Sequence, residues 1–68
     1  MTVADVENLV ARVAELGDSD PESAHSHEDR LYEAVLTAIA TGAGAASPAA
    51  LCVAALQTKR LNFPRWCA

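Results

Sequence analysis

Two dipeptides that start helices divide this chain into three segments, each long enough for one helix. Asp20-Pro21 and Ser47-Pro48 each place a side chain that accepts hydrogen bonds directly before a proline. Aspartate and serine are good helix caps, and proline suits the first helical turn because its missing N–H would be unpaired there anyway. Since no segment alternates polar and apolar residues as a β-strand does, the sequence predicts an all-α domain of three helices.

The helices are predicted to span about residues 3–16, 21–40 and 48–60, and residues 61–68 are predicted to form an extended C-terminal tail. Thr2 is expected to cap the first helix, with Asp5 in the third position of a capping box. Gly17 is expected to end that helix, because glycine is the usual residue after a helix C-terminus. Pro64 prevents the third helix from continuing through the tail.

Apolar residues on these helices predict self-association. The first helix carries a valine seam with the 3-4-3 spacing of a coiled coil, and residues 31–40 form a broad apolar face. The third helix has no charged residue between Ala49 and Leu56, which is typical of a helix central in a core or shared with another chain. A core of this size is marginal alone, so we expect a helical homodimer built on these apolar faces. The seam comprises Val3, Val6, Val10 and Val13.

Charge and cysteine content narrow the class of protein. The net charge is −4, and all nine acidic residues lie in residues 1–33, which disfavours nucleic acid as a partner. A small DNA-binding transcriptional regulator remains the alternative, although its recognition helix would be apolar. Two cysteines are too few for a disulfide framework. We expect no signal peptide, because no positively charged region precedes an apolar run near residue 1, and no apolar stretch approaches the length needed to span a membrane. The sequence therefore predicts a cytoplasmic protein with reduced thiols.

Groups that carry chemistry are few. His25, His27, Glu28 and Asp29 form the one cluster that resembles a metal or acid–base site. His27 points away from the others on a helix, so we interpret the cluster as a solvated polar helix end that binds no structural metal. Cys52 has no base near it in sequence and is expected to be a small buried residue. With no catalytic or cofactor motif, the chain is predicted not to be an enzyme and to bind no cofactor.

The C-terminal tail holds the side chains best suited to binding a partner. Arginine and tryptophan dominate interface hot spots, and Arg60, Phe63, Arg65 and Trp66 all lie within seven residues. Two interpretations stay open: the tail binds a partner, or its aromatic residues fold back to complete a small core. We favour the second slightly and expect Trp66 to be mostly buried, against its own chain or a second copy.

Two segments carry a resemblance to a known group of proteins. Residues 27–40 (HEDRLYEAVLTAIA) and 55–66 (ALQTKRLNFPRW) resemble small uncharacterised proteins of mycobacterial phages, which belong to the actinobacteriophages. The resemblance brings no catalytic or binding residues. It implies a small interaction module that binds and modulates a host protein in the host cytoplasm.

Overall fold

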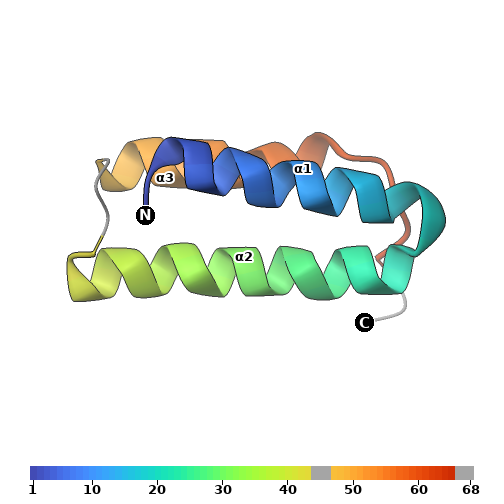
Figure 1. Ribbon diagram of the computed structural model, residues 1–68, viewed down its shortest axis with the longest axis horizontal. Coiled ribbons are helices and arrows are strands. Elements are labelled where there is room, and N and C mark those ends of the chain that lie inside the picture. The colour runs from blue at the N-terminus through green and yellow to red at the C-terminus, as the bar shows by residue number, and fades with distance from the viewer. Residues whose placement is uncertain (44–46, 66–68) are drawn as a thin grey trace.

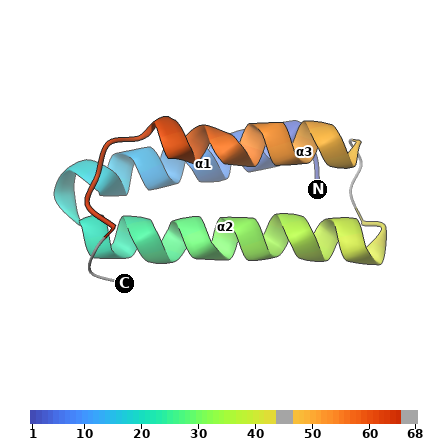
Figure 2. The same cartoon turned by 180° about the vertical axis from the view of Figure 1, so that it is seen from behind.

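Three helices run along the long axis of the molecule. The computed structural model describes residues 1–43 and 47–65. Its helices are α1 (Val3–Ser19), α2 (Pro21–Thr41) and α3 (Pro48–Ala55), and α3 leads directly into the 3-10 helix η1 (Leu56–Arg60). α1 and α3 lie beside each other above α2 (Figure 1), and the view from behind shows α3 in front of α1 (Figure 2). The described residues contain no strand, which confirms the predicted all-α class.

Side-chain caps begin all three helices, as the sequence predicts. The Asp5 N–H donates to the Thr2 hydroxyl at 3.1 Å, and the Asp5 carboxylate accepts from the Thr2 N–H at 2.8 Å, completing the capping box. Asp20 caps α2 by accepting from the Ser23 N–H at 3.2 Å, and Ser47 caps α3 in the same way. These contacts satisfy N–H groups that have no partner within the helix.

The end of α1 differs from the prediction, because the helix continues through Gly17 to Ser19. The Asp20 N–H donates to the Leu16 carbonyl at 2.7 Å, so Asp20 closes α1 and caps α2 at once. Gly17 has a different role. A Cβ atom at this position would lie 3.2 Å from the Phe63 ring, so glycine allows a tail residue to approach the helix backbone.

α2 and α3 end in different ways. α2 ends at Thr41 because Gly42 adopts the left-handed backbone conformation, with φ at 72°, which costs glycine little. The third predicted helix, 48–60, is helical over this range but changes type after Ala55. The chain winds into the tighter 3-10 helix from Leu56 onward, as is common at the C-terminal ends of α-helices.

The valine seam of α1 is used inside a single chain. Val6 and Val13 are fully buried, Val6 against α2 and α3 and Val13 beside Ala24 and Phe63. The other seam residues are partly covered by the same core. Val6 and Val13 therefore serve the core of a single chain, and the homodimer stays a prediction.

Candidate functional site

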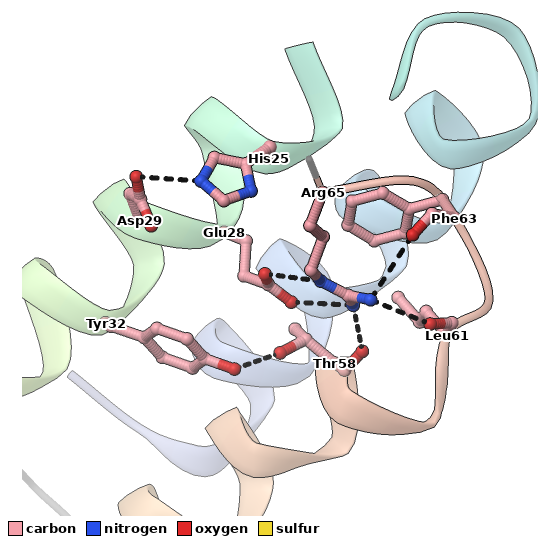
Figure 3. Close-up of polar contacts among 8 residues, drawn as sticks. All are labelled: His25, Glu28, Asp29, Tyr32, Thr58, Leu61, Phe63 and Arg65. Carbon is pink, nitrogen blue, oxygen red and sulfur yellow. Dashed lines mark hydrogen bonds and ion pairs between the residues drawn. The ribbon is translucent and has the colours of Figure 1, made fainter. Parts of the chain in front are cut away.

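The tail is held to the helices by a network of hydrogen bonds around Arg65 (Figure 3). Its Nε and Nη2 atoms donate to the two carboxylate oxygens of Glu28 at 2.8 and 3.0 Å. Nη2 also donates to the Thr58 carbonyl at 2.8 Å, and Nη1 to the carbonyls of Leu61 at 3.3 Å and Phe63 at 3.4 Å. One guanidinium group thus joins the tail to α2 and η1, in the two-pronged geometry that arginine favours.

Glu28 stays ionised at this site despite its burial. Only 2% of the residue is exposed. Burial by itself raises the pKa of Glu28. Hydrogen bonds from Arg65 and Thr58 lower it, as do the positive charges of Arg65 and Lys59, and together they outweigh the effect of burial. The pKa of Glu28 therefore lies below its usual 4.5. The Glu28 hydrogen bonds correspondingly raise the pKa of Arg65. The guanidinium carbon lies 3.9 Å from the Phe63 ring centroid, stacked on the ring.

The four residues predicted to bind a partner do not form one surface in the part of the chain that the structure describes. Phe63 is buried between α1 and α2, beside Val13 and Ala24, so this aromatic residue folds back onto the body. Arg65 lies next to it in the network around Glu28. Arg60 is exposed at the end of η1, and Trp66 lies outside the described residues. Phe63 and Arg65 are therefore occupied by the fold itself.

The two side chains of the histidine cluster contact different partners. His25 Nε2 lies 3.4 Å from Asp29 Oδ2, whereas His27 Nδ1 bonds to the Ser23 carbonyl at 2.9 Å. Among residues 1–43 and 47–65, no three histidine, cysteine or acidic side chains are close enough to hold a metal. The interpretation as a wholly solvated helix end is wrong for Glu28.

The burial of Glu28 has a sequence signal that motif searching missed. Five residues of α2 follow each other at alternating intervals of four and three residues, and all are buried. They are Ala24, Glu28, Leu31, Val35 and Ala38. Glu28 therefore lies on the core-facing stripe of α2. A carboxylate in such a stripe requires a cation brought from elsewhere in the chain.

The contact between α2 and η1 has a second polar component. The Tyr32 hydroxyl hydrogen-bonds the hydroxyl of Thr58, which is fully buried. Lys59 extends across the same ring, with its ammonium group 5.6 Å from the Tyr32 centroid. The Tyr32–Thr58 hydrogen bond (Figure 3) and the Lys59 contact position the last turn of the α3–η1 segment against α2.

The outer side of α3 is apolar and exposed. Val53 is 61% exposed and Leu56 is 56% exposed, and Leu36 on the neighbouring α2 is 65% exposed. We call these three residues the α3 surface. The inner side of the same helix is buried in the core through Leu51, Ala54 and Ala55. This charge-free helix therefore lies at the edge of the bundle, with its inner side buried and Val53 exposed on its outer side.

A groove runs along each side of α3. The groove between α2 and α3 has a volume of about 390 Å³, and Cys52, which is half-buried, lies on its wall. The groove between α1 and α3 has a volume of about 560 Å³. The first is lined by Tyr32, Val35, Leu36, Cys52, Ala55, Leu56 and Lys59, and the second by Val3, Glu7, Ala49, Ala50, Val53, Ala54 and Gln57.

The fold and this surface define a small three-helix protein with an exposed apolar helix at its edge. No protein-family model matches the chain, and neither a curated protein nor a solved structure matches it. In the part of the chain that the structure describes, every helix is too short or too polar to cross a membrane.

Proposed function

We propose that this chain is a small, non-enzymatic protein–protein interaction module that self-associates and binds another protein through the α3 surface. The observation that carries the proposal is the exposure of Leu36 and Leu56 on the walls of one groove, together with the exposure of Val53 on the other groove along α3. Contiguous exposed apolar patches mark interaction sites in monomeric proteins, and the centres of interfaces are depleted of charged residues.

The α3 surface replaces the tail as the main candidate for partner binding. Phe63 is buried and Arg65 is bound to Glu28, so releasing either side chain for a partner would disrupt the fold. Arg60 remains exposed beyond the end of the α3 surface and can contribute a charge at its rim. Rim charges steer a partner toward the surface more than they strengthen the complex.

The character of the α3 surface favours protein over nucleic acid as the partner. Residues 49–56 contain no charged side chain, and the described positive charges near them are limited to the end of η1, at Lys59 and Arg60. Binding to the phosphate backbone requires several cations on one face. Together with the resemblance to mycobacterial phage proteins, this supports a host protein in the cytoplasm as the partner to be bound and modulated.

A capture experiment with matched variants tests this function. Wild type, the double variant Leu36→Asp/Leu56→Asp and the control Leu9→Asp are immobilised and incubated with a mycobacterial lysate. Leu9 is an exposed leucine of α1, 39% accessible, and lies outside both grooves. Wild type and the control should capture the same proteins by quantitative mass spectrometry, and the double variant should lose them. Equal capture by all three proteins would contradict the proposal, as would wild-type capture no greater than that of the double variant.

A further inference from the structure

We propose that the pocket holding the tail is a recognition site for a short segment with an aromatic residue two positions before an arginine, supplied by another protein, and that residues 61–65 occupy this pocket as a built-in competitor. We call this pocket the tail site. It shares no residue with the α3 surface and would give the chain a second way to bind a protein. The tail site comprises Val13, Gly17, Ala24, Glu28 and Thr58.

Residues 61–65 are attached to the helices mainly by two side chains. Among the described residues, their main chain makes one hydrogen bond to the main chain of the body, from the Leu61 N–H to the Thr58 carbonyl at 3.0 Å. Beyond this turn, the side chains of Phe63 and Arg65 face the helices, whereas the residue before each of them is exposed. Bound peptides are recognised in the same way, through pockets that hold alternate side chains.

The aromatic half of the tail site is a slot against α1. Gly17 forms its floor, since a Cβ atom at this position would lie 3.2 Å from the Phe63 ring. Val13 and Ala24 complete the slot, and both are fully buried. These small apolar residues leave room for a flat ring, and Phe63 fills the slot so closely that only 7% of it is exposed. An aromatic side chain in a well-packed pocket is a typical anchor of an interface.

The arginine half of the tail site is a buried carboxylate. Glu28 is 2% exposed, and its two oxygens accept from Nε and Nη2 of Arg65 at 2.8 and 3.0 Å (Figure 3). The Thr58 carbonyl accepts from the same Nη2 atom at 2.8 Å. The ammonium group of a lysine lacks the planar fork that matches these acceptors. When the tail leaves, Glu28 loses its cation, and a guanidinium group from another chain would restore the pair.

Residues 61–65 also carry contacts of their own that fix the spacing of the two anchors. The guanidinium carbon of Arg65 lies 3.9 Å from the Phe63 ring centroid. Nη1 of Arg65 donates to the carbonyls of Leu61 at 3.3 Å and Phe63 at 3.4 Å. These contacts lie within the segment, so a separate peptide of the same sequence retains them. Order of this kind in a ligand reduces the entropic cost of binding.

The tail competes with any such partner because it is tethered beside the site. A short tether gives an effective concentration of about millimolar, so a free segment should bind the wild type weakly. Segments with few buried contacts open locally at low free-energy cost, which gives a partner access to the site. Exchange of tails between two copies adds no contacts, whereas a different protein can add contacts around the site. We therefore assign the tail site to a different protein.

Binding of a peptide to the full chain tests the tail site. The probe is the peptide of residues 61–65 (LNFPR) with blocked ends, and a second peptide has alanine in place of its arginine. Both are titrated into wild type, Arg65→Ala, Glu28→Gln/Arg65→Ala and Glu33→Gln/Arg65→Ala, and the dissociation constants are measured from amide chemical shifts by NMR. Glu33 is an exposed acid of the same helix, so its variant matches the charge of the Glu28 variant and leaves the site intact.

The tail site makes a specific pattern of dissociation constants necessary. Arg65→Ala and Glu33→Gln/Arg65→Ala should bind the probe equally to within about twofold, and at least about tenfold more tightly than wild type, because the tethered tail closes the wild-type site. Glu28→Gln/Arg65→Ala should bind at least about tenfold more weakly than Arg65→Ala, since it lacks the charged acceptor. The alanine peptide should bind none of them. The shifts should be largest around Gly17 and Ala24.

Three outcomes would overturn the inference. Equal binding by Arg65→Ala and Glu28→Gln/Arg65→Ala would mean that the carboxylate does not hold the peptide. Wild-type binding as tight as that of Arg65→Ala would place the peptide elsewhere on the molecule, and a folded Arg65→Ala that binds nothing would show that the site accepts no segment in trans. If circular dichroism shows that Arg65→Ala is unfolded, Arg65→Lys and Glu28→Gln/Arg65→Lys replace the corresponding proteins, and the same three outcomes apply to them.

Discussion

The carboxylate of Glu28 is the side chain whose state depends most on a single other residue. It is buried on the core stripe of α2, and two of its hydrogen bonds come from Arg65, 37 residues later in the chain. Arg65→Ala would leave this carboxylate buried without a cation. Removing one partner of a buried pair costs about 3–5 kcal/mol, and we expect the lower end because the Arg65 side chain is 26% exposed. Urea unfolding followed by circular dichroism measures the loss.

Two further substitutions show whether the loss comes from the paired geometry. Arg60→Ala removes an exposed arginine from the end of η1 and should change the free energy of unfolding by less than about 0.5 kcal/mol. Arg65→Lys keeps the charge but lacks the planar fork, so it should fall between wild type and Arg65→Ala. Equal stability of Arg65→Ala and Arg60→Ala would show that the network around Glu28 does not stabilise the fold.

The lowered pKa of Glu28 predicts the direction of the pH dependence of stability. In the unfolded chain the carboxyl group takes up a proton near its ordinary pKa of 4.5, whereas in the folded protein it stays ionised to lower pH. The unfolded state therefore binds more protons below about pH 4.5, and stability falls as the pH decreases through this range toward the folded pKa. Above about pH 6 this group adds no further pH dependence.

Comparison with Glu28→Gln isolates this contribution. Asp5 and Asp20 also have lowered pKa values, because their carboxylates accept hydrogen bonds at the helix caps, so both proteins should lose some stability in acid. The loss between pH 5 and pH 3, measured by urea unfolding at each pH, should be smaller in Glu28→Gln. Parallel curves for the two proteins would exclude Glu28 as a source of acid sensitivity.

At the scale of elements, the tail depends on a glycine in the last turn of α1. A Cβ atom on Gly17 would lie 3.2–3.4 Å from three Phe63 atoms, so Gly17→Val should push the ring away from Val13 and Ala24. Overpacking of this kind costs about 1–3 kcal/mol. The matched control is Ala11→Val, at an exposed position of the same helix, which should cost less than about 1 kcal/mol through helix propensity alone. Thermal unfolding compares them, and an equal loss would mean that the tail does not pack closely on Gly17.

Helix starts were predictable because their causes are local. Asp20 and Ser47 each accept a hydrogen bond from an N–H three residues later, so a short segment contains all the information. The role of Gly17 depends instead on Phe63, which lies in a different part of the chain and packs against this glycine inside the helix. The partner of Glu28 was missed for the same reason: the stripe indicates burial, but nothing near it indicates Arg65.

At the scale of the whole molecule, the sequence predicts more apolar helix surface than one chain covers. The structure shows where this additional apolar surface lies. Val6 and Val13 of the α1 seam are buried within the bundle, whereas Val53 and Leu56 are left exposed together with Leu36. The absence of charge in residues 49–56 is visible in the sequence, but which side of α3 faces outward depends on how the three helices pack. Propensity and periodicity do not determine that arrangement.

Self-association through the α3 surface would make thermal stability depend on protein concentration. Binding of a second copy stabilises only the folded state, so the midpoint of unfolding rises with concentration by mass action. For a domain of this size, each tenfold increase should raise the wild-type midpoint by about 3–5 °C. Leu36→Asp/Leu56→Asp places charges on two exposed side chains of this surface and should have a midpoint that is independent of concentration. Leu9→Asp should retain the wild-type slope. Differential scanning calorimetry between about 10 and 1,000 μM distinguishes these outcomes, and a flat wild-type midpoint would mean that the chain is stable as a monomer.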